Sequence, residues 1–223
     1  MRILDIYKNL NKKSIKWDNY FEIFETHLGK YVEKNPTVLE IGIAEGGSLE
    51  MWSKYFVNGQ IHGIDAFEGV LQYKYDEPNV YVHHGDQSDP EYWKYFHKST
   101  THLNFDVIVD DGSHINKDQI LTLIELFPRL NQGGTFIIED THTSYWEKWG
   151  GGLGQGDTFI QNSKGLIDFL HRQHIGQQPP EHLAEVFKDL HSITYYNSVV
   201  VLTKRPYTDM QPYGSKDIGH GWK

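Results

Sequence analysis

The sequence predicts an α/β protein with a doubly wound, mostly parallel sheet that ends in an antiparallel hairpin. Short apolar runs alternate with amphipathic segments between residues 37 and 140. Strands that alternate with helices in this way indicate a parallel sheet covered by helices on both faces. Two further apolar runs flank a turn near Asn197 and predict the hairpin over residues 192–205. Together with the five earlier runs, they give a sheet of seven strands.

The composition excludes several classes of protein. The 223 residues are 38% hydrophobic and 14% aromatic, which is enough for one sizeable core. A formal net charge of -9 argues against a nucleic-acid partner, whose phosphates require a basic surface. The absence of cysteine rules out disulfides, zinc–thiolate sites and a cysteine nucleophile. No apolar run is long enough for a signal peptide or a membrane span, so we expect a cytoplasmic protein that does not bind membranes.

Residues 1–35 form a predicted helical segment ahead of the sheet, and Pro36 ends this segment. Within it, residues 16–32 carry apolar side chains at helical spacing. Such a stripe is typical of a helix that packs on a core or serves as a lid. The stripe consists of Trp17, Tyr20, Phe21, Phe24 and Leu28.

The remaining elements follow from apolar runs and capping residues. Strands are predicted over residues 37–43, 60–67, 80–86, 105–111 and 133–140. Helices are predicted over residues 46–56, 90–99, 116–130 and 165–173. Asp89 supplies the N-cap of the second of these helices and Pro90 its first residue. Residues 206–223 form a polar tail to which the sequence assigns no structure.

Acidic residues end each of the five predicted parallel strands. A buried unpaired charge is costly, and the preference of Asp for turns explains one such residue more readily than five. Ligands of open α/β sheets bind beyond the carboxyl ends of the strands, so these acids mark a candidate site. They are Glu40, Asp65, Asp86, the pair Asp110 and Asp111, and the pair Glu139 and Asp140.

The loop after the first strand, EIGIAEGG, indicates a nucleoside cofactor. Gly42, Ala44 and Gly46 match the G-x-G-x-G form found in S-adenosylmethionine-dependent methyltransferases, with Ala44 in the middle, and Ser48 follows. The spacing differs from the G-x-G-x-x-G fingerprint of dinucleotide sites, and no Gly-Lys-Ser/Thr follows, which excludes a P-loop. A tight turn that binds no ligand is the alternative interpretation.

Three segments resemble those of metal-dependent sugar O-methyltransferases. They are GDQSD, VDDGSH and IIEDTHTSYW, which start at Gly85, Val109 and Ile137. The family includes macrolide-sugar methyltransferases and related cephalosporin hydroxylase-like and rhamnosyl methyltransferase-like proteins, and the resemblance covers residues 36–147. It implies a Rossmann-like class I methyltransferase fold over residues 36–205. It also implies methyl transfer from S-adenosylmethionine to a hydroxyl of a sugar, a glycosylated natural product or a polysaccharide.

The resemblance further implies how the acids and histidines are used. Asp111, Glu139 and Asp140 look like oxygen ligands of Mg²⁺, or of another divalent cation such as Mn²⁺. An ion there would neutralise carboxylates that otherwise repel one another and would lower the pKa of a bound hydroxyl. His114 resembles the general base of the family. A loop-capping role is the alternative for His114, and His142 is a second catalytic candidate.

The other acids are assigned to the cofactor. Asp65 is expected on the ribose hydroxyls of a nucleoside cofactor. The further cofactor positions are Glu40 and Gly42 at the methionine end, Asp86 and Gln87 at the adenine edge, and Asp110 at the methionine amine or in support of its loop.

The acceptor side is expected after the fifth strand. Tyr145 and Trp146 can pack their aromatic faces on a sugar ring, although burial in the core is the alternative. The glycine-rich loop of residues 150–156 is expected to act as a lid or as a simple connection. The acceptor is predicted to be a hydroxylated small molecule or glycan, and a homo-oligomer is possible.

Two other functions stay open at this point. An NAD(P)-dependent oxidoreductase would also place Asp65 on a ribose. However, the nicotinamide fold lacks the terminal hairpin, and no Tyr-x-x-x-Lys pattern lies in the expected place. A non-catalytic binding module would keep the cofactor and metal pockets without turnover.

Overall fold

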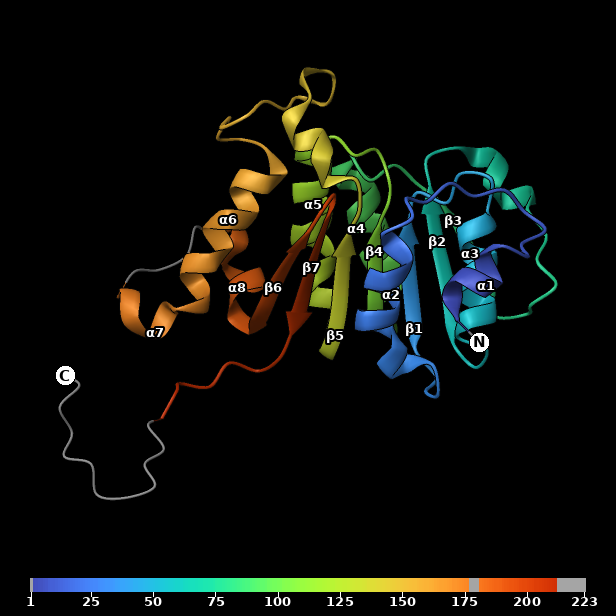
Figure 1. The fold of residues 1–223 in the computed structure, drawn as a ribbon, viewed down its shortest axis with the longest axis horizontal. Helices are drawn as coiled ribbons and strands as arrows, with labels where there is room; N and C mark the ends of the chain where they lie inside the picture. Colours follow the sequence, from blue (N-terminus) through green and yellow to red (C-terminus); the bar gives the residue numbers. More distant parts are fainter. Residues whose placement is uncertain (1, 177–180, 212–223) are drawn as a thin grey trace.

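The structure, a computed structural model, describes residues 2–176 and 181–211. It has three layers, with a single sheet between two layers of helices (Figure 1). Most of the predicted polar tail, residues 212–223, lies outside the described residues. None of the described helices combines the length and the apolar character that crossing a membrane would require.

The seven strands lie in the order β3-β2-β1-β4-β5-β7-β6. The first five are parallel, whereas β7 runs antiparallel to both β5 and β6. The predicted mostly parallel sheet with a C-terminal hairpin is therefore confirmed. The strands are β1 (Thr37–Ile41), β2 (Gln60–Asp65), β3 (Val80–His84), β4 (Phe105–Asp110), β5 (Leu130–Ile138), β6 (Leu190–Tyr196) and β7 (Val199–Lys204).

The order of the strands reverses at β1, and this reversal positions the site. From β1 the chain moves outward through β2 and β3 and then returns to place β4 on the other side of β1. Ile41 at the end of β1 is in register with Ile64 of β2 and with Asp110 of β4. The loops after β1 and β4 therefore leave the same edge of the sheet, where a crevice opens at the switch in strand order.

Helices cover both faces of the sheet, and Figure 1 shows α6 and α8 in orange beside β6. The helices of one face are α1 (Ile3–Tyr7), α2 (Tyr20–Leu28) and α3 (Gly47–Tyr55). Those of the other face are α4 (Pro90–Ser99), α5 (Asn116–Leu126), α6 (Phe159–Leu170) and α8 (Ala184–Asp189). Shorter helical pieces include η4 (Thr141–Tyr145), directly after β5, and α7 (Arg172–Ile175).

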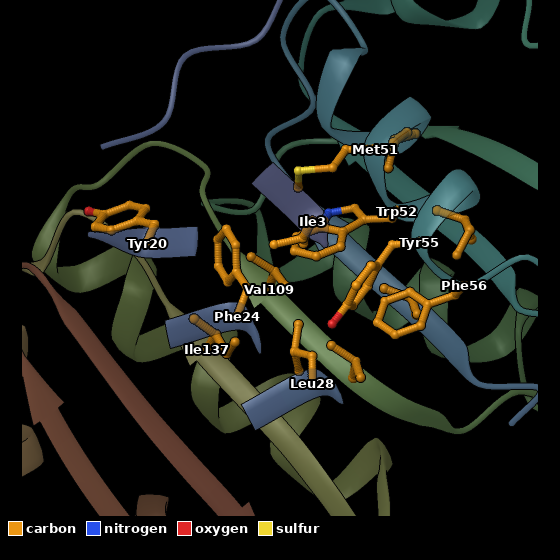
Figure 2. Packing of buried hydrophobic residues seen from close by; sticks show 14 of the residues in the cluster. Ile3, Tyr20, Phe24, Leu28, Met51, Trp52, Tyr55, Phe56, Val109 and Ile137 are labelled. Atoms are coloured by element: carbon orange, nitrogen blue, oxygen red, sulfur yellow. The ribbon is translucent and has the colours of Figure 1, made fainter. Parts of the chain in front are cut away.

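The N-terminal helices belong to the main core. Figure 2 shows Phe24 of α2 next to Trp52 of α3, with Val109 of β4 and Ile137 of β5 close by. The rings of Phe24 and Trp52 meet edge to face, with 5.1 Å between their centroids. Burying one such side chain stabilises a fold by roughly 1.5–3 kcal/mol. Helix α2 is therefore part of the body that positions the site, and helices α1 and α2 share their core with the sheet.

Most predicted elements agree with the structure to within a few residues. The Asp89 side chain caps α4 by accepting a hydrogen bond from the amide of Glu91, as predicted. The helix predicted over residues 165–173 begins earlier, at Phe159, because the side chain of Thr158 provides an N-cap to the amide of Gln161.

Candidate active site

A cavity of about 730 Å³ lies at the carboxyl ends of β1, β2 and β4. Its volume is within the range of small-molecule sites. Part of its wall comes from the N-terminal segment, between residues 7 and 15. The predicted site residues in its wall are Gly42, Ala44, Ser48, Asp65, Asp111, His114 and Asp140.

Glycines let the loop after β1 turn close to the loop after β4. Gly42 and Gly46 have φ angles of 81° and 85°, which glycine adopts without steric strain. A Cβ atom at position 42 would lie 2.1 Å from the carbonyl oxygen of Asp111. Only glycine therefore permits the two loops to touch at this point.

Asp65 organises the same loop from the end of β2. Its Oδ2 accepts hydrogen bonds from the amides of Ile43 and Ala44, both at 2.9 Å. Its Oδ1 accepts a third from the amide of Phe67 at 2.9 Å. The carboxylate is only partly buried and borders the cavity, so its remaining lone pairs can accept from the hydroxyls of a ligand.

A smaller cavity of about 210 Å³ continues the first one past β2. The walls of both cavities include Gly42, Asp65 and Gly112. Asp86 and Gln87, predicted at the adenine edge, border this smaller cavity. The two cavities together therefore bring most of the predicted cofactor residues to one place.

Gln87 and Asp110 form a buried support for these walls. Nε2 of Gln87 donates to Oδ1 of Asp110 at 3.2 Å, and its Oε1 accepts from the amide of Ser113 at 2.6 Å. Asp110 is fully buried and lines neither cavity. Burial raises the pKa of Asp110 to about 7. Of the two predicted roles for Asp110, this geometry favours support of its loop.

Asp111, His114 and Asp140 form an acidic cluster at the ends of β4 and β5. Each offers one ligand atom, and these atoms lie within 4.8 Å of one another. Nε2 of His114 is 3.4 Å from Oδ2 of Asp140, and its Nδ1 has no hydrogen-bond partner among the described residues. His114 and Asp140 have positive φ angles of 57° and 54°, a strained conformation that is typical of functional sites.

Glu139, the third predicted metal ligand, is bound to a lysine. Nζ of Lys16 lies 2.9 Å from both carboxylate oxygens of Glu139 and 2.7 Å from Oδ2 of Asp111. Burial alone would lower the pKa of Lys16, but the charges of Asp111, Glu139 and Glu40 outweigh it and raise that pKa well above its ordinary value. Burial also raises the pKa of Glu40 to about 7, against the opposing charge of Lys16. The pKa of Glu139 rises well above its ordinary value for the same reason.

Asp140 is held by two side chains at the start of α2. The indole Nε1 of Trp17 donates to Oδ1 of Asp140 at 3.1 Å, and the hydroxyl of Tyr20 donates to the same oxygen at 2.5 Å. Tyr20 is buried, in agreement with the predicted packing stripe, whereas Trp17 is 57% exposed. Trp17 therefore belongs to the site and not to the core.

An aromatic rim packs around His142, which lies 4.0 Å from Asp140. The rings of Trp17 and Trp146 meet the imidazole edge to face, with centroid distances of 6.0 and 4.5 Å. Trp149 packs against Trp146 at 5.4 Å. Trp146 is 47% exposed and Tyr145 is 45% exposed. Burial in the core, the alternative interpretation of this pair, is therefore wrong.

No pattern in the sequence indicates that Lys16, Tyr20 and Ser198 contact the predicted site residues. Ser198, in the turn of the hairpin, places its hydroxyl 2.9 Å from that of Tyr20 and within hydrogen-bond distance of Nδ1 of His142. Contacts over such sequence separations leave no local pattern.

The cluster at the ends of β4 and β5 suits a divalent cation. Carboxylate oxygens are the hard donors that Mg²⁺ prefers, and imidazole is a ligand that Mn²⁺ also accepts. The charge of such an ion would balance the carboxylates of Asp111 and Asp140. Glu139 can join the set only if Lys16 withdraws, because both oxygens of Glu139 are bound to its ammonium group.

The strand order, with the paired cavities at its switch point, is that of a class I methyltransferase fold. In sequence, the chain is related to sugar O-methyltransferases. It is 31% identical over 206 residues to 8-demethyl-8-alpha-L-rhamnosyl tetracenomycin-C 2'-O-methyltransferase of Streptomyces olivaceus, covering 88% of this chain and 53% of that protein. It is 33% identical over 199 residues to L-olivosyl-oleandolide 3-O-methyltransferase of Streptomyces antibioticus, covering 82% of this chain and 50% of that protein.

A solved structure shows the same likeness. MycE methyltransferase from the mycinamycin biosynthetic pathway, in complex with Mg and SAH, matches with a TM-score of 0.80 and 28% identity over 92% of this chain and 55% of its own. The predicted resemblance to sugar O-methyltransferases is thereby confirmed. The chain spans about half the length of the curated relatives it matches. No known protein-family profile matches it.

Proposed function

We propose that this chain is a metal-dependent O-methyltransferase that moves a methyl group from S-adenosylmethionine to a sugar hydroxyl, with a glycosylated natural product or a polysaccharide as acceptor. One observation carries the proposal: the acidic cluster and the loop after β1 border the same cavity. A methyl donor on that loop and an alcohol at the cluster would meet there. The sugar O-methyltransferase relatives, and the neighbour that contains Mg and SAH, support the same assignment.

S-adenosylmethionine would occupy both cavities. Its methionine and ribose would lie in the larger one, against Gly42, Ser48 and Asp65, and its adenine in the smaller one, beside Asp86. Asp65 would accept hydrogen bonds from the ribose hydroxyls with the lone pairs that the loop amides leave free. The predicted cofactor residues that line neither cavity are Glu40, Gly46 and Asp110, which would support the loops from behind.

Asp111 and Asp140 would hold the metal ion, and Glu139 would join them when Lys16 withdraws. Such an ion supplies Lewis-acid polarisation of the acceptor hydroxyl, which favours the alkoxide form. His114 would take the hydroxyl proton, because its imidazole borders the cavity and lies beside Asp140. His142, 4.0 Å from Asp140, is the second candidate.

The transfer itself is a displacement at carbon. The acceptor oxygen attacks the methyl carbon and forms the new C–O bond, while the C–S bond breaks and its electron pair returns to sulfur. The proton passes to His114, and S-adenosylhomocysteine leaves as a neutral thioether. The residues of the chain therefore contribute alignment of the two reactants and removal of one proton.

The aromatic rim would receive the sugar ring. Tyr145 and Trp146 are both exposed, and Trp146 packs against His142. A few aromatic side chains around convergent polar groups are typical of small-molecule sites. Ring stacking would turn one hydroxyl of the sugar toward the acidic cluster.

Methyl transfer from labelled S-adenosylmethionine to a panel of glycosylated acceptors tests the proposal. We expect transfer that requires Mg²⁺ and stops with EDTA, while S-adenosylhomocysteine still raises the melting temperature. Transfer that continues after metal removal would contradict the metal-dependent mechanism. Stabilisation by NADH and not by S-adenosylhomocysteine would favour an oxidoreductase. S-adenosylhomocysteine binding without transfer to any acceptor would favour a binding module.

A further inference from the structure

Lys16 lies where three carboxylates converge, and those of Glu40 and Glu139 are buried. Its side chain is 1% exposed, and its Nζ is 2.7 Å from Asp111, 2.9 Å from Glu139 and 3.5 Å from Glu40. One ammonium group balances only one of three carboxylates, and a buried charge without a partner is costly. A dication at the same point would balance two of them.

The segment that carries Lys16 also binds the remaining predicted metal ligand. Trp17 and Tyr20 both donate to Oδ1 of Asp140. Donors from residues 16–20 thus contact Asp111, Glu139 and Asp140, and the Lys16 ammonium occupies lone pairs of Asp111 and Glu139 that a cation would need. An ammonium group and a metal ion cannot share the space between the same oxygens, because they repel each other. Coordination by all three acids therefore requires Lys16 to leave.

The segment around Lys16 is anchored on both sides, and on its N-terminal side the anchors reach Ser14. The amide of Gly47 donates to the carbonyl of Lys13 at 3.1 Å, and the hydroxyl of Tyr7 donates to the carbonyl of Ser14 at 2.8 Å. Residues 8–19 are in neither a helix nor a strand. The amides of Asn11 and Lys12 donate to the carboxylate of Glu50 at 3.0 and 2.8 Å, and the side chain of Asn19 donates to the carbonyl of Asn197 at 3.0 Å. Between these anchors, Ile15 is 95% exposed.

We propose that the Lys16 ammonium is a displaceable substitute for the metal ion. Residues 15–18 close on the acids when no metal is bound and withdraw Lys16 when a divalent cation takes its place. The inference rests on the proposed metal-dependent function and adds the exchange to it. Ile15 also borders the cofactor cavity, so the exchange reshapes that cavity as well. Closure of the segment weakens metal binding, and metal binding disfavours closure by the same free energy.

The first test is a titration of the protein with Mn²⁺, followed by electron paramagnetic resonance. Lys16→Met removes the ammonium group and keeps an unbranched side chain. Lys8→Met removes the same charge from an exposed position of the same segment and serves as the control. We expect Lys16→Met to bind Mn²⁺ about tenfold more tightly than the wild type and Lys8→Met to match the wild type. Equal or weaker binding by Lys16→Met overturns the exchange.

The second test uses the wild-type protein and so does not depend on the folding of a variant. Cleavage by trypsin after Lys16, whose side chain is 1% exposed, should accelerate on saturation with Mg²⁺ when the products are followed by mass spectrometry, and it should not change in Asp140→Asn. Unchanged or slower cleavage after Lys16 in the metal-saturated wild type overturns the proposal. Failure of the proposed function gives a different result: neither wild type nor Lys16→Met binds Mn²⁺, which removes the metal and the exchange together.

Discussion

The hydroxyl of Tyr20 lies 2.5 Å from Oδ1 of Asp140 and joins the first turn of α2 to the end of β5. The amide of Asp140 donates back to the same hydroxyl oxygen at 3.1 Å, so the two residues are bonded twice. Asp140 has a φ angle of 54°, which a residue with a side chain adopts only when its surroundings hold it there. An acid of the proposed metal site is thus positioned by a helix of the N-terminal segment.

Tyr20→Phe is therefore expected to weaken metal binding and turnover about tenfold. The ring stays in the core, but Asp140 loses a hydrogen bond to a charged group, which is worth roughly 1.5–3 kcal/mol. Mn²⁺ affinity and kcat measure the effect. Tyr55→Phe is the matched control, because Tyr55 is equally buried and its hydroxyl binds Glu25 away from the site. Identical values for the two variants would show that Tyr20 has no special role.

Asp140→Asn is expected to abolish metal-dependent transfer while S-adenosylhomocysteine still binds. The amide has the shape of the carboxylate but lacks the charge that a divalent cation requires. Activity assays and calorimetric titration with S-adenosylhomocysteine separate the two effects. Asp168→Asn, on the exposed side of α6, controls for the loss of one surface charge. Full activity in Asp140→Asn would remove the metal from the mechanism.

Asp65→Asn is expected to weaken S-adenosylhomocysteine binding about tenfold or more, with Mn²⁺ binding unchanged. Three amides donate to this carboxylate, and hydrogen bonds to a charged acceptor are roughly twice as strong as neutral ones. The loop after β1 would lose its shape, and the ribose would lose its acceptor. Calorimetry with each ligand tests the prediction, which fails if both affinities fall together.

His62 is expected to make the protein less stable in mild acid. Burial, with a contribution from His83, lowers its pKa to about 4. The pKa of a histidine in an unfolded chain is about 6.5. The unfolded state therefore binds more protons between these values. His62 therefore contributes its full stabilisation above the pKa of the unfolded state. This stabilisation is lost as the pH falls toward the pKa of the folded state. Between about pH 7 and pH 5 the loss is about 2 kcal/mol.

Urea unfolding at these two pH values measures that loss. His62→Phe keeps an aromatic ring against Tyr81 and Phe105 and should lose less stability on acidification than the wild type. His191→Gln, at an exposed position, should behave as the wild type does. An equal loss of stability in His62→Phe and wild type would assign the acid sensitivity to another group.

The sequence predicts the sheet and the acids at its edge because both follow from simple rules. The carboxyl ends of parallel strands meet, so Asp65, Asp111 and Asp140 converge on one cavity. The partner of Glu139 does not follow from such a rule, because Lys16 approaches it across 123 positions of the sequence. The start of α6 at Phe159 could not be predicted from the sequence either, because its cap, Thr158, follows a glycine-rich loop without an apolar pattern.

The missing side chain at position 42 has a mechanical consequence. Because Gly42 lies directly against Asp111 and Gly112, neither loop can shift without pushing the other. Under the proposed function, strain introduced at the acceptor side would be transmitted to the methyl donor. Engineering of the proposed sugar site should therefore spare both loops and vary Tyr145 and Trp146, whose side chains are exposed.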